Sequence, residues 1–222
     1  MDTVWTRPER GARGPAPEHS RAQLTAVAIE LADADGLAAV SMRRVAGQLG
    51  TGPASLYRYV AGRDDLIDLM SDAVAGEIDL GVPLTGDPVD DLVALAVRTK
   101  DVQLRHPWVL DVPPEPLRLG PRGLDYLEHT LRALAPSPLS GQAKLEAIGL
   151  LSAQVTIFAR TELQGRQAAS GRRAAQAAYL AQAAAAGHHP TLAATMADAA
   201  EAPPVEDLFE RLVRRVLTGL LG

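Results

Sequence analysis

Four short apolar patterns of helical period follow one another between residues 20 and 78, and this succession constrains the fold more than any other feature. The first pattern places its apolar residues at i, i+3, i+4 and i+7 on one helical face: Leu24, Val27, Ala28 and Leu31. Gly36 ends it, because glycine readily adopts the left-handed conformation that follows many helices. We therefore expect short helices joined by tight turns here.

The next three patterns have equally clear boundaries. Ser41 suits the N-cap of a second helix, which the glycines in residues 50–52 interrupt. Pro53 fits the first turn of a third helix, and Gly62 ends that helix. A fourth helix is expected over residues 64–78, because two aspartates at its start complement the helix dipole.

The second and third helices, joined by a short glycine-containing turn, form a candidate helix-turn-helix. In this motif the later helix lies in the major groove, where its outward face meets bases and phosphates. The helical period predicts four outward-facing residues: Ala54, Ser55, Arg58 and Tyr59. It predicts four inward-facing ones: Pro53, Leu56, Tyr57 and Val60.

The distribution of charge supports this interpretation. The chain carries 22 Lys and Arg against 27 Asp and Glu, and its formal net charge of −5 taken alone argues against a nucleic-acid-binding protein. The acids are unevenly spread, however, because residues 36–63 contain four arginines and no carboxylate. Such a segment is expected of a surface that faces phosphates, although a chance cluster on a solvated face would look the same.

Composition favours helices throughout the chain. Alanine, the best helix former, occurs 39 times among 222 residues, whereas aromatic residues amount to 4%. Cysteine is absent, which excludes disulfides and thiolate chemistry. We expect an all-α protein with neither a signal peptide nor a membrane-spanning segment, and hence a cytoplasmic one.

Enzymatic chemistry finds little support. No glycine-rich phosphate loop, nucleophile elbow or HExxH zinc motif occurs, and we expect neither an enzyme nor a metal or other cofactor. Asp125 and His129 lie four residues apart and offer two metal ligands, but an exposed ion pair is the commoner arrangement. Residues 1–19 lack apolar periodicity and are expected to form a flexible arm.

Residues 41–66 read SMRRVAGQLGTGPASLYRYVAGRDDL and contain Leu49-Gly50, Leu56-Tyr57-Arg58-Tyr59-Val60, Arg63 and Leu66. This pattern resembles the DNA-binding signature of the TetR family of transcriptional regulators. The resemblance implies contacts at base edges from Pro53, Ala54 and Arg58, and contact with a base or the backbone from Arg43. It implies phosphate contacts from five residues: Ser41, Ser55, Tyr57, Tyr59 and Arg63. For Tyr57, packing in the core is an equally good role.

A longer helical part follows the fourth helix. Residues 89–105 form an expected helix that the His-Pro-Trp segment 106–108 ends. This segment and the proline-rich loop behind it resemble the ligand domain of the tetracycline-repressor subgroup, although Asp79 stands near the position of that repressor's magnesium-binding histidine. We expect the effector pocket among polar or aromatic residues of the apolar helices, for which packing or a surface position is the alternative: Thr99, Gln103, Trp108, Tyr126, His129, Gln154 and Phe158.

Two segments suit a homodimer interface. Residues 147–159 are uncharged within a helix expected over 141–164, and a helix that is apolar nearly all round needs cover on more than one side. The last helix, 206–221, repeats apolar pairs every four residues, a stripe wider than one core face requires. We expect these helices to form a four-helix bundle in a twofold-symmetric homodimer.

These observations predict three regions: a flexible arm over 1–19, a helix-turn-helix DNA-binding domain over 20–66, and a ligand-binding and dimerisation domain over 67–222. The expected function is that of a ligand-responsive transcriptional regulator, a repressor that a small molecule releases from a palindromic double-stranded operator. Two alternatives remain open: a helical enzyme or carrier with an incidental helix-turn-helix, and an architectural DNA binder without an effector.

Overall fold

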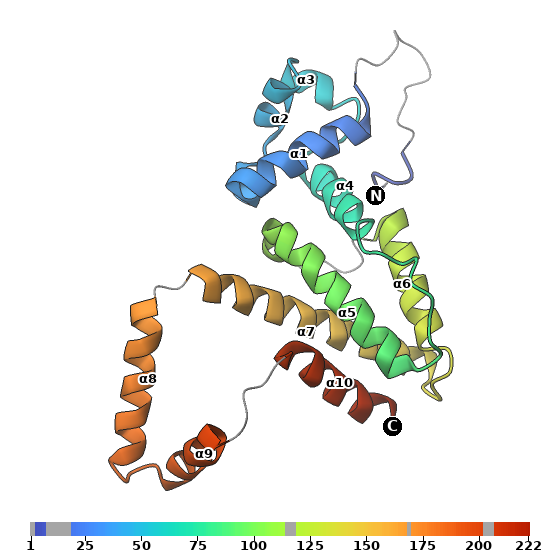
Figure 1. Cartoon of the computed structure of the whole chain (residues 1–222). Helices are drawn as coiled ribbons and strands as arrows, with labels where there is room; N and C mark the ends of the chain where they lie inside the picture. The colour runs from blue at the N-terminus through green and yellow to red at the C-terminus, as the bar shows by residue number, and fades with distance from the viewer. Residues whose placement is uncertain (1–2, 8–18, 114–118, 168–169, 202–206) are drawn as a thin grey trace.

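The computed structural model describes residues 3–7, 19–113, 119–167, 170–201 and 207–222 (Figure 1). These residues form ten α-helices, two short 3-10 helices and no β-strand, which confirms the predicted all-α class. The α-helices are α1 (Arg21–Asp35), α2 (Met42–Gln48), α3 (Pro53–Leu56), α4 (Arg63–Ala75), α5 (Pro88–Arg105), α6 (Pro121–Ala133), α7 (Gly141–Gln167), α8 (Ser170–Ala185), α9 (Pro190–Glu201) and α10 (Leu208–Leu221). The 3-10 helices are η1 (Leu37–Ala39) and η2 (Pro107–Asp111).

The end of α1 and the starts of α2 and α3 agree with the sequence analysis, and local capping explains the boundaries around α1 and α2. Two predicted ends differ, because α3 ends at Leu56 well before Gly62, and α4 ends at Ala75 and not at residue 78. Ser20 and Gln23 form a capping box at the start of α1, in which each side chain accepts the backbone N–H of the other residue. Gly36 follows α1 with a φ of 80°, a conformation that glycine adopts without steric cost. Ser41 caps α2 by accepting the Arg44 N–H.

The helices enclose two apolar cores that share α5. The first core lies among α1, α2, α3 and α4 and reaches one side of α5 and η2 through Leu95, Val102 and Trp108. The second lies among α5, α6, α7 and α10 and includes Leu92 and Leu151. The domain boundary predicted between residues 66 and 67 therefore falls inside α4 and inside the first core.

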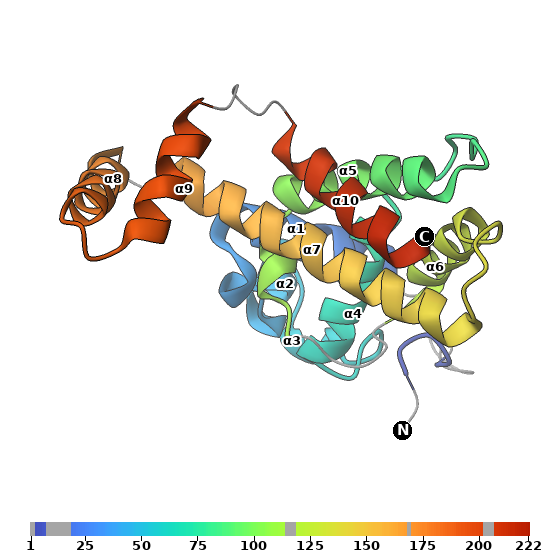
Figure 2. The same cartoon turned by 90° about the horizontal axis from the view of Figure 1, so that it is seen from below.

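The helices α8 and α9 form a pair at one side of the molecule, to the left in both views (Figures 1 and 2). They pack against each other. The alanine-rich sequence explains α8, whereas α9 was not predicted. Within the described ranges, no helix combines the length and the hydropathy needed to cross a bilayer.

Four side chains, which we call the junction cluster, fasten η2 to α1 and to the end of α4. Trp108 is 2% exposed and donates its indole N–H to Asp33 Oδ1 at 2.8 Å. The ring of His106 lies 2.8 Å from the same oxygen through Nδ1 and 3.1 Å from Glu77 Oε2 through Nε2. The junction cluster therefore joins the helix-turn-helix half of the chain to the half that follows it.

Part of the expected flexible arm is docked on the body of the protein. Val4 is fully buried in the first core, and Trp5 packs against that core. The expectation of a flexible arm over 1–19 is therefore wrong at residues 3–7, where two adjacent apolar residues are too few to give a periodic signal. Residues 8–18 lie outside the described part of the chain.

Candidate DNA-contact surface and effector pocket

The turn between α2 and α3 is fixed by local hydrogen bonds. Gly50 has a φ of 69°, and the Thr51 N–H donates to the Ala46 carbonyl at 2.9 Å. Ser55 Oγ donates to the Gly52 carbonyl at 2.7 Å and lies 2.8 Å from Thr51 Oγ1. The Ser55 hydroxyl therefore positions the start of α3, and its phosphate contact stays a prediction.

The helix α3 is a single turn, and this shortness reverses the predicted orientation of two tyrosines. After Leu56 the backbone tightens, because the Tyr59 N–H donates to the Leu56 carbonyl three residues back at 2.9 Å. A turn of three residues instead of 3.6 rotates the following side chains, so that Tyr57 is 56% exposed and Tyr59 only 3%. The predictions that Tyr57 and Pro53 face inward and that Tyr59 faces outward are wrong.

Five predicted contact residues lie exposed on α2, on α3 and just after it, and we call them the contact face: Arg43, Pro53, Ala54, Tyr57 and Arg58. The neighbouring Arg44 is paired with Asp35 at 2.5 Å, whereas Arg43 has no ion pair with any described residue. Residues 36–63 contain no carboxylate, so the contact face carries the positive charge of its two arginines and no acid of its own.

Arg63 and Ser41 hold the loop in front of α2. Arg63 donates from Nε to the Val40 carbonyl and from Nη2 to the Leu37 carbonyl, each at 2.9 Å. A guanidinium has five N–H donors and a serine hydroxyl retains its own proton while it caps a helix, so both side chains keep capacity for a phosphate. Tyr59 differs, because it is buried and its hydroxyl already accepts the His19 N–H at 3.3 Å.

Two residues of the predicted effector pocket meet between α5 and α6. Thr99 and Tyr126 are joined by a hydrogen bond of 3.3 Å between their hydroxyls, and Thr99 also donates to the Leu95 carbonyl at 2.8 Å. Burial raises the pKa of the Tyr126 phenol, against smaller opposing effects of its hydrogen bonds to Thr99 and Thr130 and of the Arg98 charge. The phenol is therefore protonated at neutral pH.

Three further pocket residues have buried polar atoms with no hydrogen-bond partner among the described residues: Gln103 Oε1 on α5, His129 Nε2 on α6 and Gln154 Oε1 on α7. A buried unpaired polar atom costs about 1–3 kcal/mol, so most such atoms in native proteins meet a partner. Burial and the charges of Arg98 and Arg132 lower the pKa of His129, which is therefore neutral at pH 7. These side chains are suited to hydrogen-bond a molecule that enters between the helices.

The last two predicted pocket residues have other neighbours. Trp108 belongs to the junction cluster and is tied to α1. Phe158 packs edge-to-face on Phe209 of α10, with ring centroids 5.3 Å apart, and borders a groove of about 480 Å³ among α5, α7 and α10. Lys100 lies in this groove, 4.6 Å from the centre of the Phe209 ring. The assignment of the seven residues to an effector pocket stays a prediction.

Comparison with known protein families identifies both halves of the chain. The family described as "Tetracyclin repressor-like, C-terminal domain" matches residues 82–222, and "Bacterial regulatory proteins, tetR family" matches residues 24–70. The first match alone covers more than half of the chain. The protein belongs to the TetR family, whose members are DNA-binding transcriptional regulators.

Individual relatives agree with this assignment. The HTH-type transcriptional repressor DrrR1 of Streptomyces coeruleorubidus is 35% identical over an alignment 231 residues long, which covers 99% of this chain and 84% of that protein. The crystal structure of apo ActR from Streptomyces coelicolor superposes with a TM-score of 0.74 at 28% identity, covering 94% of this chain and 97% of that one. ActR in complex with actinorhodin also gives 0.74, at 28% identity over 94% of this chain and 98% of that one.

Proposed function

We propose that the protein is a repressor that binds a pseudo-palindromic operator as a homodimer and leaves it when a small molecule occupies the pocket between α5, α6 and α7. The observation that carries this proposal is the contact face, an exposed, acid-free surface on the second and third helices of a helix-turn-helix. Two such faces in a twofold dimer would enter successive major grooves, about one helical turn or somewhat more apart. We place this activity in the cytoplasm, and we propose no enzymatic activity.

The effector half of the proposal is supported by the unpaired atoms of Gln103, His129 and Gln154. A ligand that hydrogen-bonds them removes a cost that the empty protein bears, so occupancy can favour a different arrangement of the helices. Because ActR was solved with actinorhodin and resembles this chain at 28% identity, we propose that the effector is actinorhodin or a molecule similar to it. The helix α4, which joins the two halves, is the proposed lever.

Actinorhodin is the first probe for this pocket. We expect it to raise the thermal unfolding temperature of the wild-type protein and to weaken operator binding. His129→Ala is expected to reduce both effects together. Equal stabilisation of the wild type and the variant would place the site elsewhere, and no stabilisation of either would overturn the proposed class of effector.

The dimer is proposed on the exposed apolar residues of α7 and α10. Leu150 and Ile157 are seven residues apart on one face of α7 and are 53% and 63% exposed. On α10, Phe209, Val213 and Leu217 are buried, whereas Leu208 and Val216 beside them are 47% and 41% exposed. Both helices therefore keep apolar surface that a second copy can cover. Sedimentation that shows a monomer at micromolar concentration would exclude this interface.

The test of DNA binding is a comparison of matched arginine variants. Operator fragments are selected from the genomic DNA of the source organism, and binding is followed by fluorescence anisotropy across a salt series. We expect Arg43→Ala and Arg58→Ala to weaken binding by about tenfold or more, with a salt slope lower by about one wherever a phosphate contact is lost. Arg172→Ala, on exposed α8, removes the same charge as a control. Equal binding by all three would refute the contact face.

A further inference from the structure

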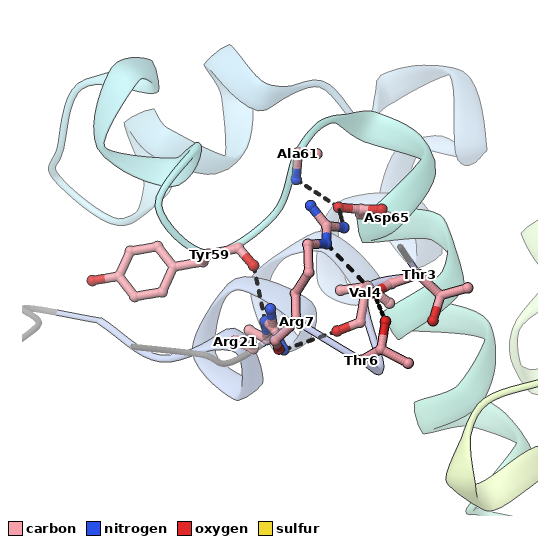
Figure 3. A network of polar contacts seen from close by, with 8 residues as sticks. All are labelled: Thr3, Val4, Thr6, Arg7, Arg21, Tyr59, Ala61 and Asp65. Atoms are coloured by element: carbon pink, nitrogen blue, oxygen red, sulfur yellow. Dashed lines mark hydrogen bonds and ion pairs between the residues drawn. The ribbon is translucent and has the colours of Figure 1, made fainter. Parts of the chain in front are cut away.

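The docked segment Thr3–Arg7 lies beside the start of α1 and the start of α4, and Arg21 links it to the Tyr59 carbonyl just beyond the recognition helix (Figure 3). Its anchor is Val4, which is fully buried in the first core. The segment is also internally ordered, because the Thr6 backbone N–H and hydroxyl both donate to the Thr3 carbonyl, at 3.2 and 3.1 Å. A segment held in this way is part of the DNA-binding half.

Arg21, the first residue of α1, ties the docked segment to the recognition helix. Its Nη1 donates to the Val4 and Arg7 carbonyls, each at 3.0 Å, and its Nε donates to the Tyr59 carbonyl at 2.9 Å. Tyr59 lies where the chain leaves the recognition helix α3 and turns toward α4. One guanidinium therefore connects the docked segment with the chain just beyond the recognition helix, as Figure 3 shows.

Asp65 provides a second connection. Its Oδ2 accepts the Ala61 N–H, at 2.5 Å, and forms an ion pair with Arg7. The two side chains of this pair are 29% and 17% exposed, so the pair is partly screened from water. Arg7 thus contacts the carboxylate that fixes the loop between α3 and α4.

Trp5 extends the docked segment to the other half of the protein. It borders a groove of about 490 Å³ together with Asp72 of α4 and Arg122 of α6. A methyl group added at Gly120 would lie 2.4 Å from Trp5 Cζ2, so the indole rests directly on the backbone where α6 begins. Asp72 accepts the Gly123 N–H at 2.9 Å in the same place.

We propose that residues 3–7 are a clasp that sets the position of the recognition helix, with Arg7 and Arg21 as positioning residues for operator binding. The clasp holds the exit of α3 through Tyr59 and Ala61 and rests on α6 through Trp5. Arg7 therefore acts on DNA through Asp65 and does not bind phosphate itself. This inference rests on the proposed binding of operator DNA by the contact face.

The two roles of Arg7 predict opposite effects of Asp65→Asn. Loss of this acid makes the protein more positive, and it would free Arg7 for a phosphate, so a direct contact predicts tighter operator binding. The clasp predicts weaker binding, by about threefold to tenfold, because the partly buried pair is lost. Arg7→Ala is expected to weaken binding to a similar degree without lowering the salt slope, and Arg7→Lys to retain more affinity than Arg7→Ala.

The experiment measures operator affinity, salt slope and backbone amide exchange for wild type, Asp65→Asn, Arg7→Ala and Arg7→Lys. Arg172→Ala, on exposed α8, controls for charge alone. The clasp predicts faster exchange at the Ala61 N–H in Arg7→Ala, at unchanged thermal stability and unchanged Arg172→Ala affinity. Tighter binding by Asp65→Asn, or equal loss in Arg7→Ala and Arg172→Ala, would overturn it.

Failure of the clasp is distinguishable from failure of the proposed function. If wild type and Arg43→Ala bind selected DNA equally, the contact face is wrong. If Arg43→Ala loses affinity while both Asp65→Asn and Arg7→Ala bind as wild type, the contact face stands and the clasp is refuted. Thermal unfolding of each variant separates loss of position from loss of fold.

Discussion

Asp33→Ala tests the junction cluster, because one carboxylate oxygen there accepts the indole N–H of Trp108 and contacts the ring of His106. The indole is 2% exposed, so water has poor access to the donor once the acceptor is gone. Leaving a buried donor unpaired costs about 1–3 kcal/mol. Because the Asp33 side chain is itself 33% exposed, we expect a loss of about 1.5 kcal/mol, from the lower half of that range.

The assay is guanidinium unfolding followed by circular dichroism, at one fixed protein concentration because a dimer's stability depends on it. Asp33→Asn is the matched control, since its amide oxygen can still accept from Trp108, and it is expected to lose less than half as much as Asp33→Ala. If Asp33→Ala remains within about 0.5 kcal/mol of wild type, the range of ordinary surface substitutions, the junction cluster does not stabilise the protein.

Three further changes have definite expected outcomes. The pKa of His129 is lowered from its ordinary 6.5, so the unfolded chain binds the proton more readily than the folded protein does. The free energy of unfolding should therefore fall as the pH drops below about 6.5. Denaturation curves measured across this pH range should show a flatter dependence for His129→Gln. Ile157→Asp puts a charge on the proposed α7 interface and should give monomers in sedimentation, with operator affinity lost; a stable dimer would refute the interface. Gly120→Ala would bring a methyl group within 2.4 Å of Asp72 Oδ1 and Trp5 Cζ2 and should lower the thermal unfolding temperature, whereas an unchanged temperature would contradict this close packing.

Much of the fold is predictable because its signals are local. Gly36 and Ser41 mark helix ends through bonds to residues within four positions, and the boundaries predicted there agree with the structure. The orientation of Tyr57 and Tyr59 was not predictable from a 3.6-residue period, because α3 gives way to a tighter turn after one turn. Element boundaries follow from caps, whereas orientation depends on how the last residues of a very short helix hydrogen-bond.

Contacts between distant parts of the chain account for the remaining differences. Trp108 was expected in the pocket because it is aromatic in an apolar setting, but its partner Asp33 lies 75 residues away. The docking of Val4 had no periodic signal at all. Gln103 and Gln154 stand out in the sequence because an amide within an apolar helical face is unusual, and their role in an effector pocket stays a prediction.

The central claim is that two contact faces recognise a symmetric operator. Selection of DNA from a random-sequence library tests this claim most directly. The wild-type protein is predicted to enrich a pseudo-palindrome whose half-sites lie about one helical turn or somewhat more apart, roughly 10 base pairs at the least. Arg43→Ala should lose this enrichment while it keeps its fold. Enrichment of no symmetric sequence by the wild type, or the same sequence by the variant, would contradict the account.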